Sequence, residues 1–317
     1  DRLDEQSFAA RYQLGKELAR GGVGVINQAF EKRLRRHLVV KRLINQDKVS
    51  KYVLEKFIEE AQITAQLEHP NIVPVHDMGT TSGGEIYFSM KYVGGESLKT
   101  VLKRLRKADP DIVEAFPRVR ILNLFQSVCM AIAFAHSKGV LHRDIKPDNI
   151  LMDGALPRLC DFGSAYEFAV GDPGGSATPE YRAPECVTHP QTLRTAPPAS
   201  VDVYAVGAVF LELACGFPVW FPFNSRVCDP PGRPQFRCKP GRWLRGALAV
   251  PNREGRKVAK RQGEVVRDLC SVLRRMPGKG LSRDTDAVDL LERLLDVDPA
   301  SRASPAAARA LPFLAGH

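Results

Sequence analysis

The order of apolar patterns along the chain is the feature that most constrains its fold. Residues 12–93 carry short stretches with alternating or β-branched character, such as "GVINQAF" and "HLVVKRL", and one helical stretch at 50–68. After "VGGES" apolar residues recur at helical spacing, in 98–107, 119–139, 201–216 and 286–297. This order predicts an α+β chain with a small β-rich lobe, a hinge near Gly94 and Gly95, and a larger helical lobe.

One short stretch, "HRDIKPDN" at 142–149, places two carboxylates, two cations and an amide within eight residues. Metal coordination alone would use the carboxylate and the amide, but would not favour a lysine two residues from the acid. Accepting a proton from a hydroxyl while phosphate charge moves nearby would use Asp144, Lys146 and Asn149 together. The loop therefore favours phosphate chemistry.

Four weaker signals lie elsewhere in the chain. The glycines of "LARGGVGV" at 18–25 would let backbone amides approach phosphate oxygens, although an ordinary hairpin turn has the same composition. Lys41 ends the strand-like "LVVK", and Glu60 follows nineteen residues later on the predicted helix; each alone is typical of a surface residue. "CDFG" at 160–163 places an acid after a strand-like stretch. Cys160 there fits a small buried hydrophobe or a redox-reactive thiol.

Together with "APE" at 183–185, these motifs resemble the protein-kinase family in identity and order, over about residues 12–317. "ITAQLEHPNIVPV" resembles bacterial serine/threonine kinases, whereas "YRAPE" and "FPVWFPFNSRV" are closer to the cyclin-dependent and related group. The resemblance implies the bilobal α+β kinase fold. Its parts would be an N-lobe at 12–90, a hinge at 91–95 and a C-lobe at 96–317, with an irregular basic insert at about 218–283.

The resemblance also implies catalytic roles. Lys41 would pair with the α- and β-phosphates of ATP and would be oriented by an ion pair with Glu60. Asp144 would accept or orient the proton of the attacking hydroxyl, and Lys146 would neutralise charge on the transferred phosphoryl group. Such catalysis depends on positioning and electrostatic stabilisation.

ATP and Mg²⁺ are the implied cofactors. Asp161 would hold Mg²⁺ that bridges the phosphates, and Asn149 would hold the second metal. Met90 would be the gatekeeper behind adenine, and the backbone of Lys91 and Val93 would hydrogen-bond the base. The remaining nucleotide contacts would come from Leu18, Ala19, Gly21, Gly22, Gly24 and Val25.

Two further groups match supporting roles in the family. Asp202 resembles the acid that braces the catalytic loop, and Glu185 with Arg302 resembles a buried structural ion pair. The Lys146 pattern and Thr178 in "ATPEYRAPE" are typical of serine/threonine specificity.

The implied partners are protein substrates with Ser or Thr acceptors. In the activation segment Ser176 is the candidate phosphate acceptor, by self-phosphorylation in trans, with Arg143 as its cationic partner.

Departures from the family pattern leave an alternative open. Ala19 replaces the first glycine of the phosphate loop, Ala205 replaces a usual serine, and the link from Asn149 to Asp161 is about one residue short, which predicts a tight hairpin. Ala19 and the irregular insert motivate a pseudokinase that acts as a binding or scaffold module. Against it, pseudokinases usually lack part of the catalytic set, which is complete here.

The net charge of +10 is concentrated in one segment. Residues 226–283 hold 16 Lys or Arg and 4 Asp or Glu, a net of +12, so the rest sums to −2. This segment predicts a solvated basic face or a docking surface for an acidic partner. Nucleic-acid binding is not expected, because the segment has few aromatic residues, Phe236 and Trp243, to interleave with its cations. Seven scattered cysteines favour a cytoplasmic location, with a membrane anchor outside this fragment left open. No apolar run is expected to reach the length of a membrane span.

Overall fold

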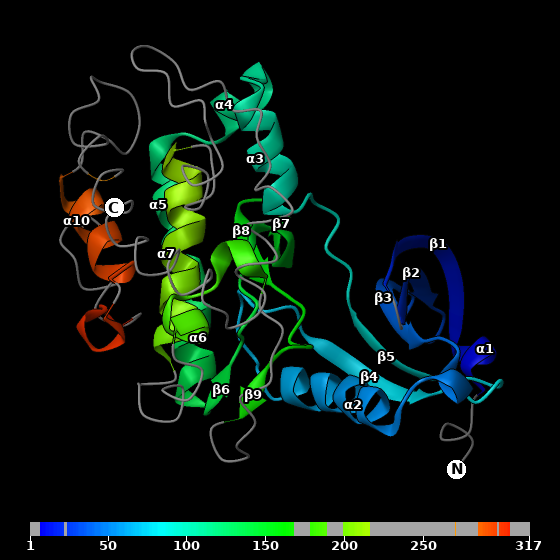
Figure 1. Cartoon of the computed structure of the whole chain (residues 1–317). Helices are drawn as coiled ribbons and strands as arrows, with labels where there is room; N and C mark the ends of the chain where they lie inside the picture. The colour runs from blue at the N-terminus through cyan, green and yellow to red at the C-terminus, as the bar shows by residue number, and fades with distance from the viewer. Residues whose placement is uncertain are drawn as a thin grey trace. The chain divides into compact units, whose positions relative to one another are not determined.

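The structure is a computed structural model that describes residues 7–21, 24–167, 178–188, 199–215, 270, 285–296 and 298–304. Ser176, Gly22 and the basic insert apart from Cys270 lie outside the described residues. The chain divides into two compact units: the first contains Asp1–Gly94 and Cys160–Gly163, and the second contains Gly95–Leu159 and Ser164–His317. The described helices and strands are labelled in Figure 1.

An antiparallel five-stranded sheet forms most of the first unit, with the strand order β1-β2-β3-β5-β4. Its strands are β1 (Tyr12–Arg20), β2 (Gly24–Glu31), β3 (Arg36–Leu43), β4 (Val75–Thr80) and β5 (Ile86–Lys91). The predicted strands at 12–19, 24–30 and 37–43 are confirmed to within one residue. β4 begins later than predicted, after Pro74, which has no N–H to contribute to a ladder. A short helix that was not predicted, α1 (Phe8–Arg11), precedes β1.

The two faces of β3 contact different apolar clusters. Leu38 belongs to one cluster, whereas Leu43 packs with Phe57 and Phe88 in the other. Because side chains alternate along a strand, Lys41 lies on the same face as Leu43, and it is paired in register with Phe88 of β5. The strand therefore directs Lys41 toward the helix that carries Phe57.

That helix is α2 (Lys51–Ala65), and it begins where Ser50 caps it: the Ser50 hydroxyl accepts a hydrogen bond from the Val53 N–H at 3.4 Å. Its buried positions recur at helical spacing, so one face of the helix is covered. Glu60 is the acidic residue on that face. The buried residues are Phe57, Glu60, Ala61, Ile63 and Thr64.

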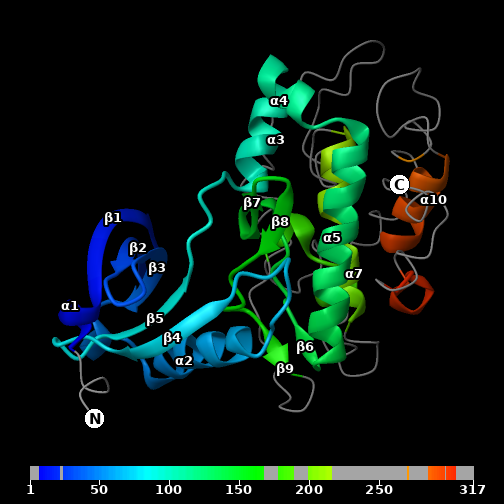
Figure 2. The same ribbon diagram turned by 180° about the vertical axis from the view of Figure 1, so that it is seen from behind.

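The second unit is mainly helical. Its helices are α3 (Leu98–Arg106), α4 (Pro110–Ala115), α5 (Arg118–Ser137), α6 (Glu185–Thr188), α7 (Ser200–Cys215) and α10 (Thr285–Leu294). Figure 2 shows α5 and α7 side by side, as their contacts require. α10 also packs on α7, where a Cβ on Gly207 would lie 2.9 Å from Leu294 Cβ. Only a glycine permits this close approach.

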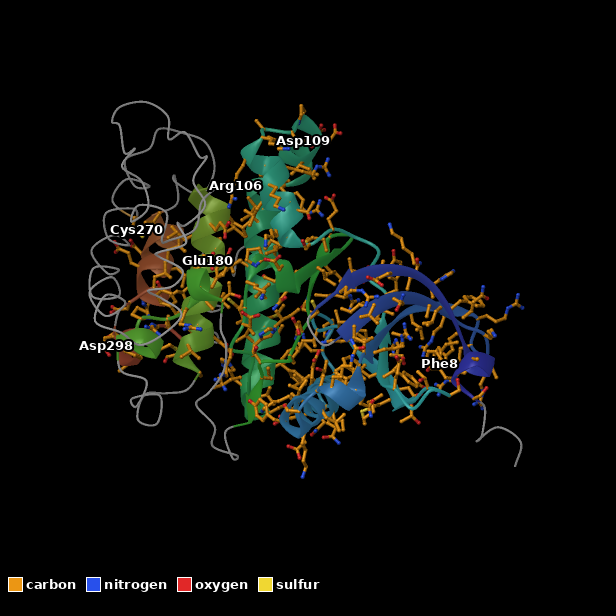
Figure 3. All side chains as sticks on the ribbon, turned by 45° about the vertical axis from the view of Figure 1, so that its right-hand side comes forward. Phe8, Arg106, Asp109, Glu180, Cys270 and Asp298 are labelled. Carbon is orange, nitrogen blue, oxygen red and sulfur yellow. The ribbon has the colours of Figure 1, made fainter. Side chains whose placement is uncertain are left out.

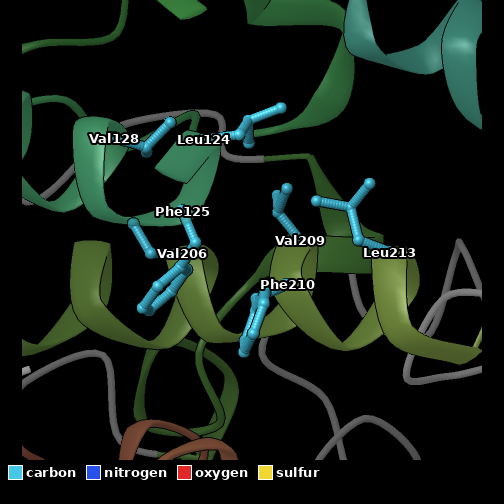
Figure 4. A pocket seen from close by; sticks show the side chains of 7 residues that line it. All are labelled: Leu124, Phe125, Val128, Val206, Val209, Phe210 and Leu213. Carbon is cyan, nitrogen blue, oxygen red and sulfur yellow. The ribbon is translucent and has the colours of Figure 1, made fainter. Parts of the chain in front are cut away.

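The contact between α5 and α7 is apolar. The rings of Phe125 and Phe210 stack with their centroids 4.2 Å apart. Figure 4 shows the cavity at this contact, which is lined by Leu124, Phe125, Val128, Val206, Val209, Phe210 and Leu213. Burial of these large side chains stabilises the helix pair.

The expectation that no apolar run reaches the length of a membrane span needs correction for α5. Val119–Ser137 has a mean hydropathy of 1.4 and is long and apolar enough to cross a membrane by length and composition. Ala131, Ile132 and Ala135 within it have no exposed surface. The core helix of a globular domain passes the same test, and the contacts of α5 with α7 place it in such a core.

Two short antiparallel strand pairs also belong to the second unit. β6 (Val140–Leu141) pairs with β9 (Tyr166–Glu167), and β7 (Ile150–Asp153) pairs with β8 (Leu156–Leu159). In the pair of β7 and β8, Asp153 lies opposite Leu156, so a turn of two residues joins the strands. Gly154 in this turn adopts a φ of 65°. The predicted tight hairpin is confirmed. The short 3-10 turn Pro147–Asn149 leads from residues 142–146 into β7.

Candidate active site

The predicted ion pair between Lys41 and Glu60 is present in the first unit. Lys41 Nζ lies 2.6 Å from Glu60 Oε1 and 2.7 Å from Oε2, so it contacts both oxygens of the carboxylate. The ammonium also lies over the rings of Phe57 and Phe88, 5.9 and 5.5 Å from their centroids. The sheet, the helix and the aromatic cluster together fix the direction of the lysine.

The charge of Lys41 is strongly favoured by its surroundings. Burial alone would lower the pKa of Lys41, but the carboxylates of Glu60 and Asp161 outweigh burial and raise it above its ordinary value. Burial raises the pKa of Glu60, against the lowering effect of the Lys41 cation. Lys41 therefore remains a cation at any physiological pH.

Asp161 belongs to the same unit and extends this cluster of charges. Its Oδ1 lies 3.9 Å from Lys41 Nζ, and its side chain is 48% exposed. The backbone of Asp161 has a φ of 65°, a left-handed conformation that is uncommon for a residue with a side chain. A Cβ on Gly163 would lie 3.0 Å from Glu60 Oε2 and 3.2 Å from Asp161 Oδ1. Glycine at this position keeps the space beside both carboxylates open.

The glycine-rich turn joins β1 to β2. The N–H of Gly21 donates to the carbonyl of Gly24 at 2.8 Å, which closes the turn. Ala19 lies within β1, in register with Ile26 directly after a register shift between Glu17 and Ala19, so the methyl that replaces a glycine hydrogen is accommodated in the strand. Leu18 is 44% exposed, whereas Val25 is buried.

The predicted hinge residues follow β5. Met90 packs against the cluster of Leu43, Phe57, Ala61 and Phe88, and Val93 is buried. The N–H of Lys91 donates to the carbonyl of Pro74 at 3.0 Å. Lys91 could therefore offer adenine its carbonyl and not its N–H.

In the second unit, Asp144 is surrounded by donors. Its Oδ1 accepts from the N–H and the hydroxyl of Thr178, at 2.9 and 2.6 Å. Its Oδ2 accepts from Lys146 Nζ at 2.5 Å, and Lys146 also donates to the Thr178 hydroxyl at 3.0 Å. The contact of Thr178 with both charged residues, inferred from the resemblance, is present.

Asn149 is fixed by the same loop. Its side-chain N–H groups donate to the backbone carbonyl of Asp144 at 2.9 Å and to Oδ2 at 3.3 Å. With the amide nitrogen committed, the amide oxygen is the atom that a cation would contact. A carboxylate such as Asp161 and an amide oxygen such as Asn149 are hard oxygen donors, which Mg²⁺ prefers.

The number of protein ligands available among the described residues also suits Mg²⁺. Within the described ranges, no group of three or more His, Cys, Asp or Glu side chains could form an all-protein metal cage. Mg²⁺ usually keeps several waters and is held by one or two protein ligands together with phosphates. The residues present therefore suit a metal that arrives with a nucleotide.

Asp202, at the start of α7, braces the catalytic loop. Its Oδ2 accepts from the backbone N–H of His142 at 2.8 Å and lies 2.9 Å from His136 Nε2, and its Oδ1 accepts from the N–H of Arg143 at 2.8 Å. Burial alone would raise the pKa of Asp202, but these partners lower it. Arg143 has a φ of 66°, so the brace holds a strained residue beside Asp144.

The buried pair of Glu185 and Arg302 is also present. The two groups form a bidentate contact, with N–O distances of 2.6 and 2.7 Å. Arg302 also donates to the carbonyls of Ser200 and Asp296. This contact ties α6 to α7 and to the chain that follows α10.

Sequence reasoning missed a second buried acid on α7, Glu212, and its partners Tyr181 and Arg106. The signal was available, since an acid in the apolar stretch "AVFLELAC" requires a buried partner. It also missed His136, the side chain that contacts Asp202. The partners themselves could not be read from the sequence, because they lie far away along the chain.

Comparison with known proteins assigns the family. The family model described as "Protein kinase domain" matches residues 12–314. The chain is 30% identical over 236 residues to the serine/threonine-protein kinase PknD of Chlamydia caviae, over 66% of this chain and 24% of that protein. For PknD of Chlamydia abortus the identity is 31% over 242 residues, with 68% and 25% covered. For PknD of Protochlamydia amoebophila it is 26% over 272 residues, with 77% and 26% covered.

The chain thus spans about a quarter of the length of these curated relatives. The family match covers nearly all of residues 1–317, and both the α+β class and the motifs of each unit agree with it. The chain belongs to the protein kinase domain family.

Proposed function

We propose that this domain is an active, Mg²⁺-dependent kinase that transfers the γ-phosphoryl group of ATP to serine and threonine hydroxyls of proteins. One observation carries the proposal: Thr178, Lys146 and Asn149 all donate to the carboxylate of Asp144. An acid held by three donors has a fixed direction, which is what orienting a substrate hydroxyl requires.

The residues of the second unit would act on the acceptor. Asp144 would orient the hydroxyl and receive its proton at a carboxylate oxygen. Lys146 would place its positive charge where the phosphoryl group moves, because its ammonium is held by Asp144 and Thr178. Both groups are in place before substrate binds, so little reorganisation is needed.

The residues of the first unit would act on the nucleotide. Lys41, held by Glu60, would offer a fixed cation to the α- and β-phosphates. The turn that the Gly21–Gly24 hydrogen bond closes would offer backbone N–H groups to the phosphates, and the Lys91 carbonyl with Val93 would receive adenine. Asp161 would hold one Mg²⁺ and Asn149 would hold the second metal, which would supply charge neutralisation for the phosphates.

Serine and threonine acceptors are supported by two observations. Lys146 and Thr178 contact each other and the same acid, as the resemblance to this class implied. The relatives in Chlamydia and Protochlamydia are called serine/threonine-protein kinases. Proteins with Ser or Thr acceptors, including a second copy of this chain, are the substrates we propose.

Nothing in the described residues favours the pseudokinase alternative. Lys41, Glu60, Asp144, Asn149 and Asp161 are all present, and Ala19 fits within β1. The cytoplasmic location also remains a proposal, supported by Cys129 and Cys186, which form no disulfide. Burial raises the pKa of Cys186 to about 12, which keeps that thiol unreactive.

The test incubates the purified domain with labelled ATP, Mg²⁺ and a generic protein substrate, and maps phosphosites by mass spectrometry. Asp144→Asn should lower turnover by about 10²–10⁴-fold and leave nucleotide affinity nearly unchanged. Asp148→Asn is the matched control, because Asp148 lies on the same loop, 40% exposed, and pairs with Lys99. Near-parental turnover of Asp144→Asn would refute the role of Asp144. Phosphate on tyrosine alone would refute the acceptor class.

A further inference from the structure

Helix α3 and the residue that caps its end, Lys107, carry five cations and no acid. These cations are Lys99, Lys103, Arg104, Arg106 and Lys107. The apolar side of the helix is buried, so the cations lie on its outer side. Lys99, Lys103 and Lys107 are exposed and recur every four residues, which places them in one stripe along the helix. The proposed mechanism does not use this stripe.

The acids next to α3 are already paired with two of its cations. The Lys99 ammonium contacts both carboxylate oxygens of Asp148, at 2.7 and 2.8 Å. Arg104 donates to Asp109 at 2.8 Å and to Glu96 at 3.1 Å. These carboxylates are therefore neutralised within the domain, and a basic peptide would have to displace an internal cation to reach them.

Two cations remain after all the pairs are formed. Arg106 pairs with the buried Glu212, and Figure 3 labels Arg106 at the end of α3 and Asp109 just beyond it. Lys103 and Lys107 are exposed and form no ion pair within the described part of the chain. The surface of α3 therefore carries an excess of positive charge at these two lysines.

The stripe begins beside the loop that carries the proposed catalytic acid. Lys99 contacts Asp148, which follows Asp144 by four residues, so the Cα atoms of the two aspartates lie at most about 14 Å apart. Lys103 lies one helical turn, about 6 Å, further along α3. An extended peptide with its hydroxyl at Asp144 would reach Lys103 within about six residues.

The spacing of the two lysines fits a particular acidic pattern. Lys103 and Lys107 are about 6 Å apart along the helix axis. An extended peptide advances about 3.4 Å per residue and alternates its side chains, so carboxylates two residues apart lie about 7 Å apart on one side. Beyond Lys107 the exposed acids Asp111 and Glu114 of α4 would repel a longer acidic run. A pair of carboxylates is therefore the best match.

We propose that Lys103 and Lys107 form a docking surface for an acidic segment of the acceptor protein, with two carboxylates spaced two residues apart. This inference rests on the proposed function and names its substrate class. The lysines would contact the substrate away from the reacting atoms. Docking should therefore lower the KM for the acceptor and leave kcat unchanged, because such contacts are equal in the ground state and the transition state.

The first test compares serine peptides that differ only within about six residues of the acceptor. One carries Glu-x-Glu, one carries two adjacent glutamates, and one carries Lys-x-Lys, each made with the charges before and after the serine. We expect the KM for Glu-x-Glu to be about 3- to 10-fold lower than for Lys-x-Lys, with adjacent glutamates between them and similar kcat values. Equal KM values for the acidic and basic peptides in both placements would overturn the proposal.

The second test reverses the charge of the surface. Lys103→Glu combined with Lys107→Glu should invert the preference, so that Lys-x-Lys has the lower KM, with unchanged kcat and unchanged KM for ATP. A misfolded domain cannot produce such an inversion. Lys48→Glu combined with Lys51→Glu is the matched control, because it changes the net charge equally at exposed positions of the other unit. Retained preference in the first variant, or the same inversion in the control, would overturn the proposal.

The third measurement needs no activity. Fluorescence anisotropy of a labelled Glu-x-Glu peptide without ATP should show binding that the double reversal on α3 weakens by about 3- to 10-fold. Binding should also weaken between 0.1 and 1 M salt, because the screening length falls from about 10 to about 3 Å. This pattern in a domain without kinase activity would support the docking surface and refute the proposed function.

Two outcomes of the binding experiment would overturn the docking surface alone. One is an active domain whose peptide affinity does not change in the double reversal on α3. The other is a labelled oligothymidine that binds more tightly than the peptide and loses its affinity in the same variant, since the lysines would then serve a nucleic acid.

Discussion

Replacing Asp202 by asparagine removes one charge and one acceptor from the base of the catalytic loop. In the parent, three donors converge on two carboxylate oxygens: the N–H of His142 and the His136 ring on Oδ2, and the N–H of Arg143 on Oδ1. An asparagine presents one oxygen and one NH₂ group. Whichever way the amide points, one backbone N–H then faces another donor.

The loss of unfolding free energy follows from this mismatch of donors and acceptors. Asp202 has no exposed surface, so water does not replace the lost acceptor. A hydrogen bond to a charged group contributes about 1.5–3 kcal/mol, and an unsatisfied buried donor costs about 1–3 kcal/mol. Because these terms overlap, we expect Asp202→Asn to lower the free energy of unfolding by about 2–4 kcal/mol. Turnover should fall as well, because Arg143 would no longer be held in its left-handed conformation beside Asp144.

The assay is urea denaturation of the parent, of Asp202→Asn and of the exposed control Asp148→Asn. The pKa of Asp202 is lowered in the folded chain, so its contribution is complete above about pH 4, the pKa of an unfolded aspartate. It is lost as the pH falls through the folded value, and the difference between parent and variant should shrink in acid. A change within about 0.5 kcal/mol at neutral pH, the range of ordinary surface substitutions, would refute the reasoning.

Three further predictions address other parts of the domain. Asp161→Ala should abolish the Mg²⁺-dependent part of ATP binding, and unchanged affinity by calorimetry in Mg²⁺ would contradict its role. Arg302→Ala leaves Glu185 buried without its bidentate partner and should cost about 3–5 kcal/mol in urea denaturation, whereas Arg104→Ala, in exposed ion pairs, should leave the midpoint nearly unchanged. Ser176→Ala should lower activity after preincubation with ATP if a phosphate there pairs with Arg143; equal activity and no phosphate on the segment would exclude this switch.

The parts of the fold that sequence could predict are those encoded by local pattern. The strands at β1, β2 and β3 and the helix α2 follow from alternation and helical spacing, and each was placed within a few residues. The short helices α1 and α4 were missed because four to six residues are too few to show a helical period. Composition also failed to separate α5 from a membrane span, because a buried core helix and a membrane helix can be equally long and apolar.

The site divides in the same way. Family motifs located Asp144, Lys146 and Thr178, and the structure adds how they contact one another. Glu212 was missed because its partners lie 31 and 106 residues away, and no local pattern identifies them. The family motifs could not predict the buried contacts around the site, because these contacts depend on packing between helices that are distant in sequence.

The arrangement around Asp144 also bears on how it would act. The resemblance to the kinase family leaves two actions open for such an acid, accepting the proton of the hydroxyl or orienting it.

 Both carboxylate oxygens already accept hydrogen bonds, from Thr178 on Oδ1 and from Lys146 and Asn149 on Oδ2. Each of these bonds fixes the direction of the carboxylate. In phosphoryl transfer little proton removal is needed before the phosphoryl group moves, because the transition state is largely dissociative. The donors around Asp144 therefore favour orientation of the hydroxyl first and receipt of its proton late.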